Sequence, residues 1–73
     1  MKEKNYLITT KIRYFNKVEN NLVVARNRKE AVVKTIAHYI VNVKVENLTK
    51  YSESILYKMA ERNGFIISEP VAV

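Results

Sequence analysis

Residues 6–15 read YLITTKIRYF, and this stretch decides the expected fold. Its side chains alternate between two faces, and aromatic and β-branched residues recur along it. One face carries Tyr6, Ile8, Thr10, Ile12 and Tyr14, and the other carries Leu7, Thr9, Lys11, Arg13 and Phe15. A period of two with such residues is typical of a β-strand. The sequence therefore predicts that the fold begins with a strand.

A second strand is expected soon after the first. Polar residues 16–20 interrupt the pattern, and residues 21–26 become apolar again. This arrangement predicts an antiparallel hairpin with a loop of four to six residues. We expect the register that pairs Phe15 with Asn21, because it places Leu22 on the apolar face that a half-buried sheet requires.

The middle of the chain predicts a helix over residues 28–40. Asn27 followed by Glu30 is a start that resembles a capping box, in which the Asn side chain accepts from a first-turn amide. Apolar residues then recur at helical spacing and form one stripe, which contains Val32, Val33, Ile36, Ala37 and Ile40. Residues 41–45 alternate again and predict a short strand.

The second half predicts another helix and a final strand. A stripe that includes Ile55 indicates a helix over residues 48–63. Gly64, the only glycine, sits where a residue of positive φ is expected after the helix. Residues 65–68 predict a strand that ends near Pro70. The expected fold class is α+β, with an N-terminal antiparallel hairpin, helix, short strand, helix and C-terminal strand in one small layer-packed domain.

Length and composition limit the architecture and the location. A chain of 73 residues has room for one core, so residues 1–73 are expected to form a single small basic domain. The absence of cysteine excludes disulfides and thiolate chemistry and is compatible with a reducing compartment. No apolar run approaches the ~18 residues of a membrane span or forms a signal-peptide core. We expect a cytoplasmic protein that does not bind a membrane.

Residue usage gives one broad resemblance. Asn, Lys, Ile and Tyr occur 8, 9, 7 and 5 times, which is typical of AT-rich coding. In this respect the chain resembles the small accessory proteins of phages and other mobile elements in low-GC bacteria. The resemblance lies in composition and implies a small regulator.

Nothing in the sequence indicates catalysis. His38 is the only histidine and is expected on the polar face of the first helix. The seven acidic residues are scattered, and one glycine cannot make a glycine-rich phosphate loop. We therefore expect a protein that is not an enzyme and has no catalytic residue, metal or cofactor.

The net charge of +6 lies wholly in residues 1–34. This half carries nine basic and three acidic residues, whereas the second half is balanced. The candidate binding residues come from the hairpin and the first turn of the helix: Lys11, Arg13, Lys17, Arg26, Arg28 and Lys29. They are expected to form one positive surface that attracts phosphates, and a two-stranded ribbon fits a major groove. The first hypothesis is nucleic-acid binding through a basic β-hairpin.

The outer face of the predicted hairpin supports a second hypothesis. In the expected register, Phe15 and Val23 lie among the basic residues and leave an apolar patch, unless the second helix crosses over to cover it. Such patches mark contacts with other chains. The alternative is therefore a modulator or inhibitor that docks on an acidic or groove-bearing host protein through this mixed face, and a homodimer is also open.

Overall fold

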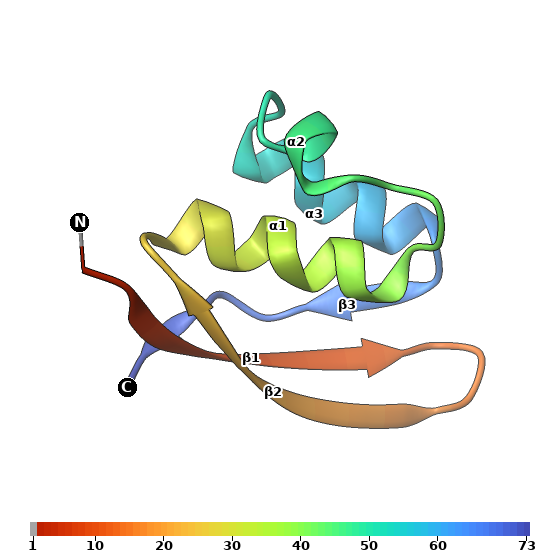
Figure 1. The fold of residues 1–73 in the computed structure, drawn as a ribbon. Coiled ribbons are helices and arrows are strands. Elements are labelled where there is room, and N and C mark those ends of the chain that lie inside the picture. The colour runs from red at the N-terminus through yellow and green to blue at the C-terminus, as the bar shows by residue number, and fades with distance from the viewer. Residues whose placement is uncertain (1) are drawn as a thin grey trace.

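Two long antiparallel strands begin the fold in the computed structural model, which describes residues 2–73. Strand β1 spans Lys4–Ile12 and pairs along its whole length with β2, which spans Lys17–Ala25. On its other side β1 pairs with β3 (Phe65–Ile67) and then with β4 (Val71–Ala72). The sheet thus has the order β2-β1-β3, with β4 beyond β3 along the same side of β1 (Figure 1).

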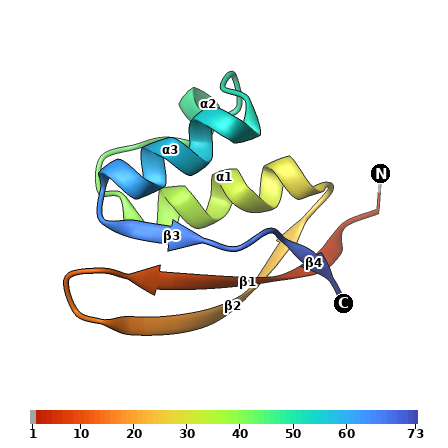
Figure 2. The same cartoon turned by 180° about the vertical axis from the view of Figure 1, so that it is seen from behind.

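Helices cover one face of this sheet. Helix α1 spans Arg28–Tyr39, α2 spans Val45–Leu48 and α3 spans Glu53–Arg62. Figure 2 shows α1 and α3 side by side above the sheet, with α2 farther out. The expected α+β class is confirmed: one small domain has a hairpin at its N-terminus, helices and a C-terminal strand.

The core lies between the sheet and the two long helices. Tyr6 and Ile8 of β1 face it, as the alternation of residues 6–15 predicts. Helix α1 contributes four apolar side chains to the core, including fully buried Ile36. The remaining apolar core consists of Ala25, Ala31, Val32, Val33, Leu48, Leu56, Ala60, Phe65 and Ile67.

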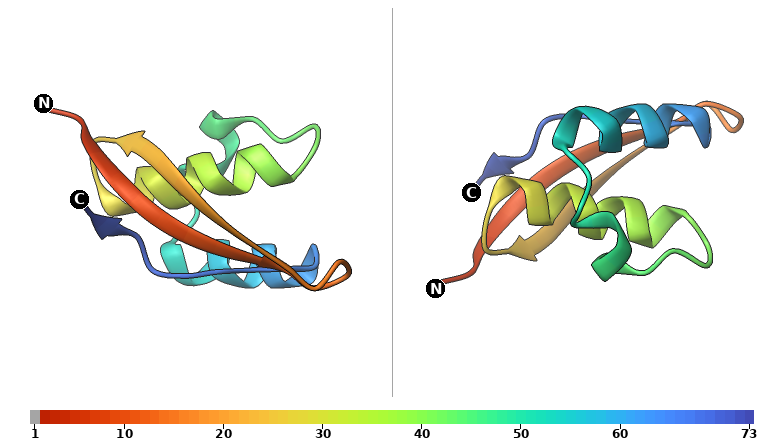
Figure 3. Two further views of the ribbon diagram at one scale, coloured as in Figure 1. Left: turned by 90° about the horizontal axis from the view of Figure 1, so that it is seen from below. Right: turned by 90° about the horizontal axis from the view of Figure 1, so that it is seen from above.

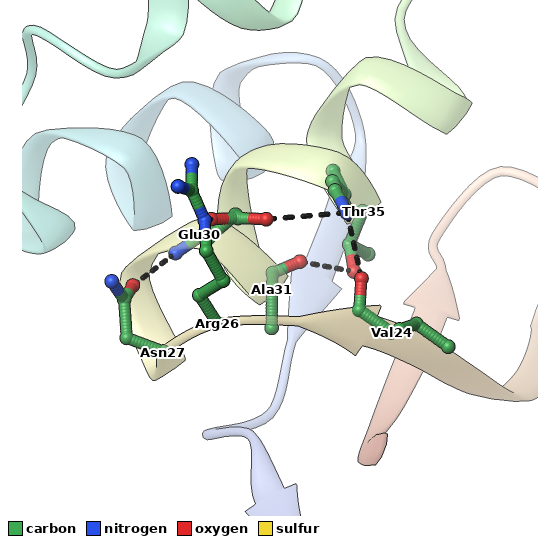
Figure 4. Close-up of polar contacts among 7 residues, drawn as sticks. Val24, Arg26, Asn27, Glu30, Ala31 and Thr35 are labelled. Carbon is green, nitrogen blue, oxygen red and sulfur yellow. Dashed lines mark hydrogen bonds and ion pairs between the residues drawn. The ribbon is translucent and has the colours of Figure 1, made fainter. Parts of the chain in front are cut away.

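The residues that begin α1 and follow α3 have the capping features that the sequence predicts. The Asn27 side chain caps α1 by accepting from the Glu30 amide at 2.8 Å (Figure 4). The Glu30 carboxylate accepts from Arg26 at 2.9 Å and not from the cap residue. Of the two contacts of a capping box, this end therefore has only the one from the Glu30 amide to the Asn27 side chain. Gly64 follows α3 with φ +90°, as expected for the residue after a helix C-cap.

The predicted hairpin register is wrong. Ile12 pairs with Lys17, so the loop is Arg13–Asn16 and Phe15 lies within it. The first strand ends at Ile12 because residues 13–16 form a turn, in which the Asn16 amide donates to the Arg13 carbonyl at 3.4 Å and Asn16 has φ +48°. On the β3 side of the sheet, the Arg13 amide donates to the Gly64 carbonyl at 2.9 Å. The difference from the expected register is an odd number of residues, so it exchanges the two faces of β2.

The exchange reverses which β2 side chains face the core. Val23 lies opposite Tyr6 and is partly buried against the core, and Ala25 is fully buried. Leu22, which was expected to face inward, is exposed on the other side together with Val24.

Two predictions for the second half are also wrong. Residues 41–45 form no strand, because Asn42 turns the chain with φ +70° and Val45 begins α2. The expected long helix is divided, since the Ser52 hydroxyl accepts from the Ile55 amide and caps a new helix at residue 53. The division rotates the apolar face, so Ile55 is 48% exposed.

No helix of residues 2–73 lies on the second face of the sheet (Figure 3). An outer patch lies on it, which we define as Val18, Leu22, Val24, Ile66 and Val71. All five side chains are exposed, and Leu7 lies between two of them because it pairs with Leu22 and Val71.

Strand β2 forms an open edge of the sheet. Its far side pairs with no strand in residues 2–73, and the Lys34 ammonium donates to the Val24 carbonyl at 2.7 Å. Backbone groups of alternate residues point to the same side of a strand. The even-numbered residues of β2 therefore direct their amides toward this edge.

Candidate nucleic-acid interface

The predicted basic residues lie at opposite ends of the molecule. Two antiparallel strands separate the hairpin loop from the start of α1 (Figure 1), and the domain is 37 Å long. The loop end has Lys11, Arg13 and Lys17, and the start of α1 has Arg26, Arg28 and Lys29. The expected single positive surface is therefore divided into two.

The bases at the start of α1 are all engaged with other groups. Arg26 donates to Glu30 at 2.9 Å, and this hydrogen bond is the main cause that lowers the pKa of Glu30. Arg28 lies 3.8 Å from the Glu69 carboxylate. The Lys29 ammonium donates to the Thr49 carbonyl at 2.6 Å. These contacts give the three bases structural roles and partly neutralise this end.

The loop end gathers bases that are far apart in the sequence. Arg13 borders a depression of about 310 Å³ together with Lys58, Glu61 and Arg62 from the last turns of α3. Arg13, Lys58 and Arg62 form no salt bridge with any residue in 2–73. Their charges remain available to an anionic ligand.

Two aromatic side chains project from the same loop. Tyr14 is 86% exposed and Phe15 is 78% exposed. Tyr14 lies against Gly64, where an added Cβ would stand 2.6 Å from the ring atom Cε2. The close approach of the ring is thus possible only beside a glycine. We call Arg13, Tyr14, Phe15, Lys58 and Arg62 the tip cluster.

The flanks of the tip cluster carry two more predicted bases. Lys11 is exposed on the outer face, opposite Val18 and Ile66. Lys17 begins β2 and lies 3.4 Å from Glu19. Of the predicted binding residues, Arg13 and Phe15 fall within the cluster, whereas Val23 packs against the core.

Sequence reasoning missed Tyr14, Lys58 and Arg62. Tyr14 was assigned to the core face of a strand that ends before it. The spacing of Lys58 and Arg62 places both on one side of the last turns of α3, but tertiary contact of Gly64 with Arg13 and Tyr14 brings that helix end to the loop. No local signal in the sequence reports this contact.

A polar network joins β2 to α1 away from the cluster. The Tyr39 hydroxyl donates to the Glu19 carboxylate at 2.6 Å and accepts from the Asn21 amide nitrogen at 2.8 Å. The hydrogen bond from Tyr39 is the main cause that lowers the pKa of Glu19. Burial is the main cause that raises the pKa of Tyr39, and the bond to Glu19 adds to it. This network anchors the hairpin to the helix.

Within residues 2–73, no three His, Cys, Asp or Glu side chains gather closely enough to hold a metal ion. His38 is exposed, with its ring edge against Tyr39. Within the same residues, no helix has the length and apolar character needed to cross a membrane. The chain matches no family model, no curated protein and no solved structure.

Proposed function

We propose that the protein binds nucleic acid through the tip cluster. One observation carries the proposal: Arg13, Lys58 and Arg62 form no salt bridge within residues 2–73 and line depressions at the end of the molecule where Tyr14 and Phe15 are exposed. Phosphates bind such basic side chains with release of counterions. Exposed aromatic rings can also stack on the faces of nucleobases.

The charge around the cluster supports an anionic ligand. Glu61 is the only acid that lines the depression with Arg13, Lys58 and Arg62. Lys11 and Lys17 lie within a few residues of the loop and extend the positive field along the hairpin. Such a field also speeds the encounter with a charged ligand, and both effects weaken with salt.

A pair of variants with equal charge tests which end of the molecule binds. The tip variant carries Arg13→Ser, Lys58→Ser and Arg62→Ser, and the control carries Arg26→Ser, Arg28→Ser and Lys29→Ser. Each variant lowers the net charge of +6 by three. Labelled duplex DNA, single-stranded DNA and RNA are titrated at about 50 and 200 mM salt, and thermal unfolding verifies that both variants fold.

We expect the tip variant to lose affinity about tenfold or more, while the control stays within a few-fold of the wild type. The salt slope of the tip variant should fall by about 0.9 per lost contact on duplex DNA or about 0.7 on single strands. Equal losses in both variants would mean that only net charge matters. No binding of any probe at low salt would refute the proposed function.

A second candidate function rests on the outer patch. Five exposed aliphatic side chains on an uncovered sheet face favour contact with an apolar surface of a protein, as in a modulator that docks on a host protein. In that case Leu22→Ser with Val24→Ser should abolish complex formation with the host protein, and the tip variant should not. A second copy of the chain on the same patch would appear as a dimer in sedimentation.

A further inference from the structure

We infer that the tip cluster binds an unpaired nucleotide, with the base stacked on Tyr14 and the adjoining phosphate held by Arg13 and Arg62. This inference rests on the proposed function and specifies its ligand as a single strand. It follows from how the Tyr14 ring is placed, from the depression beside it and from the side chains on the outer face of the hairpin.

The Tyr14 ring is supported along one edge. An added Cβ on Gly64 would lie 2.6 Å from Cε2 and 2.9 Å from Cδ2, but 3.7 Å from Cζ. The contact therefore involves the Cδ2 and Cε2 edge, and 86% of the residue stays exposed. A ring held by its edge with open faces suits base stacking, which depends on the face and tolerates any base.

Charged groups lie beside the ring. A depression of about 350 Å³ is lined by Tyr14 and Gly64 together with Arg13, Glu61 and Arg62. The two guanidinium groups can bind phosphate oxygens in a bidentate manner. The Glu61 carboxylate repels phosphate but accepts hydrogen bonds from base amino groups. The depression thus offers partners for both parts of a nucleotide.

A duplex fits this end less well than a single strand. The faces of paired bases are covered by their neighbours in the stack, so Tyr14 and Phe15 would find no base face along a helix. Reading a major groove with the hairpin would require polar side chains on its outer face. That face carries Lys11 among exposed Val18, Leu22 and Val24, and its Thr9 and Asn20 side chains are hydrogen-bonded to each other at 2.8 Å. These features favour unpaired bases.

A fluorescent reporter tests stacking directly. The chain has no tryptophan, so Tyr14→Trp introduces a single indole at the proposed stacking position. A twelve-nucleotide oligo(dT) should quench this indole and should bind about as tightly as it binds the wild type. An abasic strand of equal length keeps the phosphates but has no bases, so it should bind about tenfold more weakly and leave the indole unquenched.

Matched substitutions separate the ring from the fold. Tyr14→Phe should keep the affinity for oligo(dT), and Tyr14→Ala should lower it about tenfold without changing binding of the abasic strand. Equal binding of oligo(dT), the abasic strand and a twelve-base-pair duplex, with no quenching, would overturn the inference and leave charge-driven binding intact. Failure of every probe to bind would overturn the proposed function as well.

Discussion

Two tyrosines of the domain differ in how their hydroxyl groups are satisfied. Tyr39 bonds to Glu19 and Asn21, whereas the Tyr57 hydroxyl is buried without a partner in residues 2–73. A buried polar group without a hydrogen bond costs free energy, and a satisfied one contributes about 1 kcal/mol or more. The same chemical group therefore has opposite effects at the two positions.

Removal of each hydroxyl should show this difference. We expect Tyr39→Phe to lower the free energy of unfolding by about 1–2 kcal/mol, because it leaves Asn21 and Glu19 without their partner. Tyr57→Phe should leave stability unchanged or raise it by up to about 1 kcal/mol. Urea denaturation of both variants at neutral pH measures the effects. A larger loss from Tyr57→Phe would show that its hydroxyl has a partner in solution.

The hydrogen bond between Tyr39 and Glu19 also predicts a dependence of stability on pH. The pKa of Tyr39 is raised above 10.0 in the folded state. The stability that Tyr39 contributes is therefore fully present below pH 10.0 and is lost as the pH rises through the raised folded-state pKa. The pKa of Glu19 is lowered from 4.5 in the folded state. The stability that Glu19 contributes is therefore fully present above pH 4.5 and is lost as the pH falls through the lowered folded-state pKa.

The free energy of unfolding, measured by urea denaturation between about pH 3 and about pH 11, should therefore be constant around neutral pH and fall at both ends of the range. Tyr39→Phe should reduce both declines. It should leave part of the alkaline decline, because burial also raises the pKa of Tyr57. An unchanged profile in this variant would mean that other groups set the pH dependence.

At the scale of the element, the division of the predicted second helix changes which isoleucine supports the core. Ile36 in α1 is fully buried, and Ile55 in α3 is 48% exposed. Ile36→Ala should lower the free energy of unfolding by about 2–5 kcal/mol, and Ile55→Ala by less than about 1 kcal/mol. Chemical denaturation compares them, with Leu56→Ala as a second core substitution. Equal losses at the two isoleucines would contradict the observed face of α3.

The elements that could be predicted from the sequence are those set by local chemistry. Asn27 caps α1 through an amide three residues away, and Gly64 ends the helical layer through its own backbone conformation. The hairpin register depends instead on a tight turn at residues 13–16 and on which strand faces the helices bury, and this burial joins residues distant in the chain. The candidate site was only partly predicted for the same reason, since Lys58 and Arg62 reach the loop through tertiary packing.

At the scale of the whole molecule, the asymmetry of charge along the sequence is not an asymmetry in space. The basic first half of the chain runs the length of the sheet and back, so its charges reach both ends. Bases from the neutral second half then join the loop end. The two ends differ in whether the bases have partners, and net charge by segment does not report that difference.

The open edge of β2 predicts how the protein would behave if one side chain were lost. The Lys34 side chain of α1 reaches this edge and donates to the Val24 carbonyl, and a charged side chain that covers a strand edge discourages pairing with another chain. Lys34→Ala should shorten the lag of thioflavin-positive aggregation, whereas Lys50→Ala, an equal change of charge, should not. Adding Leu22→Pro should restore the lag, because proline removes an amide that points to the edge and leaves the β1 side of the ladder intact. Unchanged kinetics in Lys34→Ala would contradict a protective role.

On this argument, loss of the Lys34 side chain alone would leave the edge of β2 open to pairing with other copies of the chain. In a crowded cell, where partly opened copies meet often, such protection would influence how much of the protein accumulates without forming deposits. The abundance that the protein can reach would then depend on a helix side chain that lies outside both the core and the tip cluster.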